Sequence, residues 1–255
     1  MRRILTAAAL IPIAAYAVLW ANPWVFLAIL AAVACLCYRE YDAISAGFGF
    51  GAPGPMGYLF GACLLLWPGD VMFPLIVLSL VSLAWGLRGN LNELLPRAGL
   101  LAVGVIYVFG DWRCAIFLRE HSRHWLMYGL ILNWAGDIGA YYVGSRFGRL
   151  KLAPTVSPIK SWEGAAASVI LSILVAGGYL LRALPAVPWW HVVLLTAAAN
   201  AAGQVGDLAE SAMKRGARVK DSGAILPGHG GFLDRVDSTL FALPVIFAYL
   251  KLGPF

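Results

Sequence analysis

The feature that most constrains this chain is a series of apolar segments that are as long as a membrane-spanning helix and carry no charge. Hydrophobic residues make up 61% of the 255 residues and charged residues only 13%. Soluble domains are near half apolar and a quarter charged, because they need a charged surface. The composition therefore predicts an integral membrane protein built from helices.

About nine segments are apolar enough to cross roughly 30 Å of hydrocarbon, some of them only as tilted or partial spans. Their approximate ranges are 4–20, 24–38, 56–67, 71–87, 98–110, 125–143, 164–182, 190–206 and 236–250. We therefore expect an all-α, polytopic protein that forms a single membrane domain over 1–255. Within it, 1–130 contributes N-terminal helices of unknown role, and 131–255 contributes the catalytic helices and cytoplasmic loops.

The basic residues favour a cytoplasmic N-terminus, because short cytoplasmic loops hold most Lys and Arg. In this orientation 14 of the 19 Lys and Arg residues fall inside and 5 fall outside. The group from Arg113 to Arg123 fits poorly and indicates a miscounted span. The net charge of +6 is modest and sits in short turns, so we expect anionic lipids and anionic substrates as partners, and no nucleic acid. A bacterial protein of this kind would lie in the cytoplasmic membrane, with its active site facing the cytoplasm.

Five of the thirteen carboxylates gather between residues 206 and 237. If the helix over 190–206 continues, Asp207, Ser211 and Lys214 lie on one of its faces. Asp234 and Asp237, three residues apart at the start of the last helix, also share a face. Mg²⁺ takes oxygen ligands from a few carboxylates and completes its shell with phosphates and water. The two helix ends are therefore a candidate metal and phosphate site.

Basic and glycine residues of the same stretch suit phosphate chemistry. Phosphoryl and nucleotidyl transfer depend mainly on positioning and on neutralising negative charge, and the cationic candidates are Lys214, Arg215, Lys220 and Arg235. Gly230 and Gly231 allow backbone N–H groups to approach an anion, and His229 adds a donor. The alternative for this loop alone is a tight turn that re-enters the membrane.

Two further polar features lie upstream. In the stretch from Ser157 to Gly164, Ser161 is a candidate helix N-cap and Lys160 could hold a phosphate. The structural alternative is a capped helix start with an interfacial Trp, which leaves the roles of Lys160 and Glu163 undetermined. Asp137 stands as a lone buried acid inside an apolar span, which is costly. It could pair with a basic residue, bind nucleotide or metal, or face a water-filled cavity.

These residues together resemble the signature of the phosphatidate cytidylyltransferases, also called CDP-diacylglycerol synthases. The matching positions are Ser211, Met213, Lys214-Arg215, Lys220-Asp221, His229-Gly230-Gly231, Phe232, Asp234-Arg235, Val236 and Asp237. Gly206-Asp207, Asp137 to Tyr141 and Ser157 to Gly164 are similar to the family as well, except that Ile159 stands where relatives commonly carry a Lys. The resemblance covers about 133–240, while the first 130 residues match only as generic helices.

The resemblance implies transfer of the cytidylyl group of CTP to phosphatidate in phospholipid biosynthesis, with pyrophosphate as second product. It implies Mg²⁺, and a second, monovalent cation such as K⁺, at acids matching Asp207 and Asp234, with Ser211 as a further ligand and Asp237 beside them. The expected catalytic residues are Asp207, Lys214, Lys220, Asp221, Asp234 and Arg235. The expected substrate-binding residues are Asp137, Lys160, Glu163, Arg215, His229, Gly230 and Gly231. The partners are CTP, phosphatidate and membrane lipid, and a homodimer is compatible with them.

Three alternatives remain open from the sequence. A CTP-dependent polyprenol or lipid kinase would need a similar acid and metal site, but it would release CDP. An ion-coupled transporter would use Asp137 and Asp207 for its cation, but it leaves the basic Gly-Gly loop unexplained. A purely structural membrane protein has little reason to gather acids, bases and a His-Gly-Gly turn in one short connection.

Overall fold

The computed structural model describes residues 2–87, 90–225 and 230–253. Its contacts divide the chain into two compact units that interleave along the sequence. Unit 1 comprises Met1–Ala9, Asn22–Arg113 and Met213–Arg235, and unit 2 comprises Leu10–Ala21, Cys114–Ala212 and Val236–Phe255. The single membrane domain over 1–255 stays a prediction.

Unit 1 is built mainly from helices of the N-terminal half. They are α2 (Pro23–Ala46), α3 (Pro55–Leu66), α4 (Met72–Gly86), η1 (Leu91–Glu93), α5 (Leu94–Gly104) and the π-helical turn η2 (Val105–Gly110). The side chain of Asn22 caps α2 by accepting a hydrogen bond from Val25 N at 2.9 Å. Two glycines of α3 admit aromatic rings: a Cβ at Gly57 would lie 1.5 Å from the Tyr38 hydroxyl, and one at Gly61 would lie 2.1 Å from the Phe109 ring. Close helix packing around buried aromatic residues therefore forms the core of this unit.

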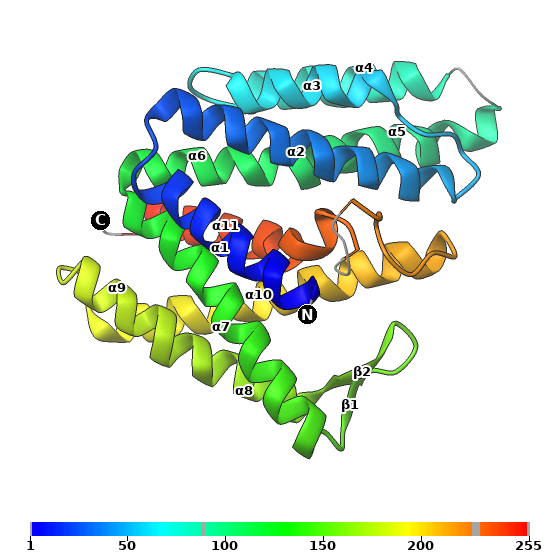
Figure 1. Cartoon of the computed structure of the whole chain (residues 1–255). Helices are drawn as coiled ribbons and strands as arrows, with labels where there is room; N and C mark the ends of the chain where they lie inside the picture. The colour runs from blue at the N-terminus through cyan, green and yellow to red at the C-terminus, as the bar shows by residue number, and fades with distance from the viewer. Residues whose placement is uncertain (1, 88–89, 226–229, 254–255) are drawn as a thin grey trace. The chain divides into compact units, whose positions relative to one another are not determined.

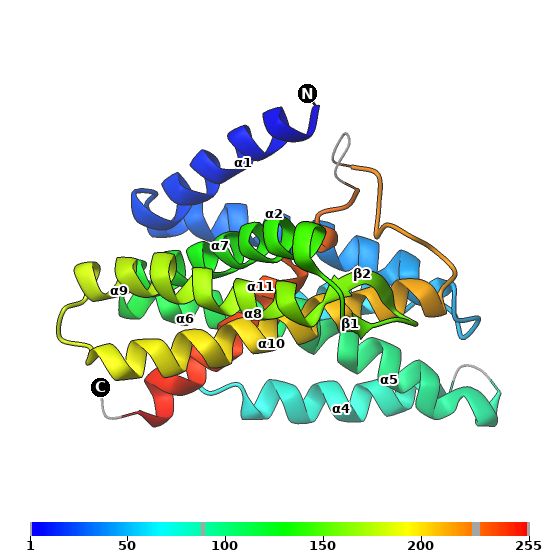
Figure 2. The same ribbon diagram turned by 90° about the horizontal axis from the view of Figure 1, so that it is seen from below.

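Unit 2 holds the longest helices and a small hairpin. Its elements include most of α1 (Arg2–Leu19), most of α6 (Asp111–His121), α7 (Arg123–Phe147), β1 (Lys151–Ala153), β2 (Ser157–Ser161), α8 (Trp162–Ser172), η3 (Ile173–Gly177), α9 (Gly178–Ala183), most of α10 (Trp189–Gly216) and most of α11 (Leu233–Leu252). Helix α7 runs beside α8 and α9, and the antiparallel hairpin joins the end of α7 to the start of α8 (Figure 1). Seen from below, the hairpin lies where α7 ends and α8 begins, at the opposite end from α9 (Figure 2). The hairpin is therefore held at the tip of a packed helix pair.

Hydrogen bonds from polar side chains link α10 to α8 inside unit 2. The Asn200 side-chain amide donates to Ser168 Oγ at 3.0 Å and to Ser172 Oγ at 2.9 Å. One turn further along α10, Gln204 Nε2 donates to Asn200 Oδ1 at 2.6 Å and to the Ala165 carbonyl at 3.2 Å. Hydrogen bonds between helices compensate for the weak driving force that apolar contacts give inside lipid. This row of side chains leads along α10 toward Asp207.

The structure confirms a helical membrane protein and changes its details. Four helical stretches among the described residues are long and apolar enough to span a bilayer, namely Pro23–Ala46, Leu91–His121, Trp162–Ala183 and Trp189–Gly216. The count of about nine crossings is not confirmed. Helix α6 lies where the sequence was interpreted as a connection, and it contains the Arg113 that fitted the charge rule poorly. The short β hairpin is the one departure from an all-α fold in the described ranges 2–87, 90–225 and 230–253. Its strands of three and five residues are too short for a clear alternation of apolar and polar side chains to indicate them in the sequence.

Candidate active site

Helix α10 continues ten residues past Gly206, beyond the expected segment 190–206, and therefore carries Asp207, Ser211 and Lys214 along it. Ser211 Oγ donates to Asp207 Oδ1 at 3.4 Å. Gly206 lets α11 approach this part of α10 closely, because a Cβ there would lie 2.7 Å from the Asp237 carbonyl and 2.8 Å from the Phe241 ring. The missing side chain at 206 thus places Asp207 beside the first part of α11 in unit 2.

The hairpin brings Lys160 to Asp207, which joins two motifs that the sequence could only place in separate connections. Lys160 Nζ lies 2.5 Å from Asp207 Oδ2, and the two side chains are 25% and 33% exposed. Ser161 caps α8 as predicted, by accepting a hydrogen bond from Gly164 N at 3.2 Å. Glu163 accepts from Leu150 N at 3.1 Å and closes the base of the hairpin. The Ser157 to Gly164 stretch therefore presents its lysine to the first acid of the candidate site.

Asp237 lies within electrostatic reach of three other acids of unit 2, namely Asp207, Glu210 and Asp137. Asp237 and Glu210 are buried, at 8% and 0% exposure. Asp137 is exposed on α7, so the expectation of a buried acid at this position was wrong. Within the described ranges, no three acid, His or Cys side chains converge closely enough to hold an ion between them. The arrangement is nevertheless a concentration of negative charge that favours cationic partners.

In unit 1, Asp234 forms a buried ion pair with Lys214. Lys214 Nζ lies 2.5 Å from Asp234 Oδ1, and the two side chains are 11% and 7% exposed. Asp234 Oδ2 accepts hydrogen bonds from Gly231 N at 2.8 Å and Ser222 N at 3.0 Å. Burial raises the pKa of the Asp234 carboxyl, but the hydrogen bonds and charge of Lys214 and the two backbone donors outweigh it, so its pKa lies below the ordinary value. Asp234 is thus held as a carboxylate.

The loop at Gly230 and Gly231 donates a backbone hydrogen bond to an acid of the protein itself. Gly230 has a φ of +80°, which L side chains rarely adopt, and a Cβ there would lie 2.5 Å from Asp234 Oδ2. The Gly231 N–H, predicted to approach a phosphate, points at Asp234. His229 lies outside the described residues. The loop therefore shapes the surroundings of Asp234 in the structure.

The remaining predicted cationic residues surround the end of α10 and the start of α11. Arg218, at φ +60°, reverses the chain after α10, and Val219 N donates to the Lys214 carbonyl at 2.9 Å in the manner of a Schellman cap. The predicted residues with exposed side chains in this part of unit 1 are Arg215, Lys220, Asp221 and Arg235. Their exposed side chains are available to a charged substrate.

The side chains present fit a divalent cation by their chemistry. Asp207 with the Ser211 hydroxyl in unit 2, and Asp234 in unit 1, each offer oxygen ligands of the kind that Mg²⁺ prefers. Each of the two carboxylates already attracts an ammonium group at 2.5 Å, which shows that both positions stabilise positive charge. A metal ion at either acid would compete with Lys160 or Lys214 for the same oxygens.

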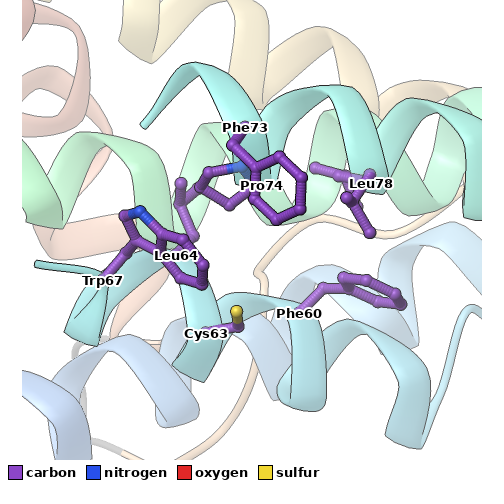
Figure 3. A pocket seen from close by; sticks show the side chains of 8 residues that line it. Phe60, Cys63, Leu64, Trp67, Phe73, Pro74 and Leu78 are labelled. Carbon is purple, nitrogen blue, oxygen red and sulfur yellow. The ribbon is translucent and has the colours of Figure 1, made fainter. Parts of the chain in front are cut away.

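A hollow between α3 and α4 in unit 1 is a contrasting feature. Its lining is apolar, with Phe60, Trp67 and Phe73 around it (Figure 3). It contains none of the charged candidate residues, and a nucleotide triphosphate needs cationic or metal partners. This hollow is therefore no candidate for the nucleotide site.

Sequence reasoning missed one acid in the surroundings of Asp234. Glu40 on α2 is only 3% exposed and contacts the loop before α11. The sequence signal was its place in Arg39-Glu40-Tyr41-Asp42, a charged stretch next to an apolar segment taken to end at residue 38. Since α2 runs on to Ala46, Glu40 lies within a helix and not in a loop.

These observations first define the class of protein. It is a polytopic helical membrane protein with two ion-paired acids, one within α10 and one at the start of α11. The sequence model described as the cytidylyltransferase family matches residues 1–253, and the chain belongs to this family. The family resemblance inferred from the motifs is thereby confirmed.

Several curated relatives carry one name. The phosphatidate cytidylyltransferase of Bacillus subtilis (strain 168) is 39% identical over 159 residues, which cover 61% of this chain and 59% of that protein. That of Staphylococcus saprophyticus is 33% identical over 181 residues, covering 71% and 70%. That of Staphylococcus haemolyticus is 36% identical over 172 residues, covering 68% and 66%. The match to the Bacillus protein thus spans less than two thirds of that protein's length.

Proposed function

We propose that this protein transfers the cytidylyl group of CTP to phosphatidate, giving CDP-diacylglycerol and pyrophosphate for phospholipid biosynthesis. Family membership over 1–253 and the name shared by the relatives support this proposal. The structural observation that carries it is the ion pair of Lys160 with Asp207, because it joins two separate sequence motifs at one place.

In the proposed reaction an oxygen of the lipid phosphate attacks the α-phosphorus of CTP, and the bond to pyrophosphate breaks. The attacking phosphate is already anionic, so no strong general base is needed. Exposed Arg215, Lys220 and Arg235 hold phosphate oxygens, together with Lys214. Asp137, Lys160 and Glu163 position the nucleotide or the lipid, and Asp221 lies next to Lys220 in the basic loop.

We propose that Mg²⁺, beside a monovalent cation such as K⁺, takes its protein ligands from Asp207, Ser211, Asp234 and Asp237, as the family resemblance implies. When bound, the divalent ion supplies charge neutralisation for the departing pyrophosphate. Asp207 and Asp234 supply carboxylate ligands in this arrangement. Lys160 pairs with Asp207, and Lys214 pairs with Asp234. In the proposed arrangement the ammonium groups of these two lysines lie beside the incoming phosphates.

The membrane arrangement is also a proposal in its finer points. We propose about nine crossings, with the short apolar helices as partial or tilted spans, and an active site that faces the cytoplasm. A homodimer is part of the same proposal. Labelling of single cysteines placed at Lys151 and Lys220 from either side of sealed vesicles tests the orientation, and both positions should react from the cytoplasmic side.

The experiment that tests the function is incubation of the purified protein with CTP, Mg²⁺ and phosphatidate, followed by identification of both products. CDP-diacylglycerol with an equal amount of pyrophosphate is the expected result. Release of CDP with a phosphorylated lipid would identify the kinase instead. Ion flux in proteoliposomes without nucleotide, and no lipid product, would identify the transporter.

A further inference from the structure

Glu40 connects the N-terminal half to the segment that carries Asp234. Its carboxylate, 3% exposed near the end of α2, accepts three hydrogen bonds from residues more than 180 positions away. Ser222 Oγ donates at 2.7 Å, Phe232 N at 3.0 Å and Leu233 N at 2.8 Å. All four residues belong to unit 1. Such a set of donors satisfies a buried carboxylate that would otherwise be costly.

Two of these donors belong to the start of α11, which begins at Leu233. The first N–H groups of a helix have no partner within the helix, and the positive end of the helix dipole favours a carboxylate there. Glu40 therefore acts as an N-terminal cap supplied from a distant part of the chain. Charge-assisted hydrogen bonds of this kind are stronger than neutral ones.

Glycines leave the space that this carboxylate fills. A Cβ at Gly231 would lie 2.2 Å from Glu40 Oε2, and a Cβ at Gly223 would lie 2.5 Å from Glu40 Oε1. Any larger residue at either position would have to displace the carboxylate. Gly231, which was expected to approach a phosphate, is thus needed for a structural reason: a residue without a side chain leaves room for the Glu40 carboxylate.

The same residues determine the environment of Asp234. Ser222 donates through Oγ to Glu40 and through its backbone N–H to Asp234 Oδ2 at 3.0 Å. Gly231 N also donates to Asp234 Oδ2 and immediately precedes the donor Phe232 N. Glu40 thus holds both chain segments whose N–H groups orient the Asp234 carboxylate.

We propose that Glu40 is a positioning residue: its carboxylate caps α11 and fixes Ser222 so that Asp234 keeps the orientation needed to bind the metal that neutralises the substrate phosphates. This inference rests on the proposed role of Asp234. It assigns a part in the reaction to the N-terminal half, which carries none of the residues of the family signature.

The test compares Glu40→Gln with Asp42→Asn in the full-length purified protein. Asp42 is a matched control because it lies two residues further along α2 and accepts a hydrogen bond from Gly54 N at 2.7 Å, away from α11. A glutamine at 40 replaces one oxygen with an NH₂ group, which cannot accept from the donors on that side. We expect Glu40→Gln to raise the Mg²⁺ concentration for half-maximal activity about tenfold, because a charged hydrogen-bond partner is lost. The KM for phosphatidate should stay within about twofold, and Asp42→Asn should match the unmodified protein in both values.

A second readout does not depend on activity. Hydrogen exchange of the peptide that contains 232 and 233 should become faster in metal-free Glu40→Gln and stay unchanged in Asp42→Asn. If Glu40→Gln fails to fold, Ser222→Ala removes a single donor to Glu40 and should give a smaller change of the same kind. Unchanged metal dependence and exchange in a folded variant would overturn the role of Glu40. Full activity of Asp234→Asn would instead overturn the proposed site itself, so the two failures are distinguishable.

Discussion

The two lysine–aspartate pairs have the same chemistry and the same 2.5 Å separation, but their surroundings differ. The pair of Lys160 and Asp207 joins a hairpin to a helix and is a quarter to a third exposed. The pair of Lys214 and Asp234 is nearly buried and receives two further backbone N–H groups. Exposed pairs contribute little stability, whereas breaking a buried pair leaves an uncompensated charge. We infer that Asp207 is free to exchange partners, while Asp234 also stabilises the fold.

The largest effect on stability is expected at the buried pair. Asp234→Asn should lower the free energy of unfolding by about 3–5 kcal/mol, because Lys214 is left without its counter-charge in a buried position. Lys214→Met combined with Asp234→Asn should recover a large part of this loss but no activity. Unfolding in mixed detergent micelles measures both variants. A double variant as unstable as Asp234→Asn alone would contradict the importance of the ion pair.

A smaller effect is expected at Gly230. Alanine there must adopt a φ of +80°, which costs about 1–2 kcal/mol, and its Cβ would also press on Asp234 Oδ2. Gly69, with a φ of +88° and nothing within 4 Å of its would-be Cβ, is the matched control. Both alanine variants should lose similar stability from the backbone, and only Gly230→Ala should lose cytidylyl transfer. Equal activity in the two variants would show that the loop does not need to hold Asp234.

Asp207→Asn should change stability by less than about 1 kcal/mol, because the Lys160 pair is partly exposed and screened. The same unfolding assay that is used for Asp234→Asn gives the comparison directly. A loss as large as that of Asp234→Asn would remove the contrast between the two pairs.

The smallest effect is expected at Ile159, which is 85% exposed on the hairpin next to Lys160. Ile159→Lys places a second ammonium group near the proposed phosphate contact and should lower the KM for CTP by about threefold or less, since surface charges act weakly. Ile159→Gln is the uncharged control and should leave the KM unchanged. The effect should also fade at high salt, because screening shortens the range of exposed charges.

The sequence predicted the parts of the site that depend on helix periodicity. Asp207 and Ser211 lie one turn apart, so a continuing helix was enough to place them together, and α10 does continue. Ser161 as an N-cap is equally local, since a cap depends on residues three positions apart.

Contacts between distant segments could not be predicted in this way. Nothing in the spacing of residues says that Lys160 reaches Asp207 or that Glu40 caps α11, because both contacts depend on tertiary packing. Asp137 was expected to be buried because its neighbours are apolar, yet its side chain is exposed on α7. On a helix that faces lipid, exposed side chains are commonly apolar, as buried ones are. The hydropathy of the sequence around Asp137 therefore did not show which face of α7 packs against other helices.

The most direct test of the central claim is the CTP-dependent activity of purified Asp207→Asn, the variant expected to keep its stability. The measurement is the formation of CDP-diacylglycerol and pyrophosphate from CTP, Mg²⁺ and phosphatidate, with folding checked in the same preparation. We predict a folded protein whose rate is lowered by about a hundredfold or more, as expected when a carboxylate that neutralises reacting charge is lost. A folded Asp207→Asn protein with an unchanged rate would contradict the assignment of the active site.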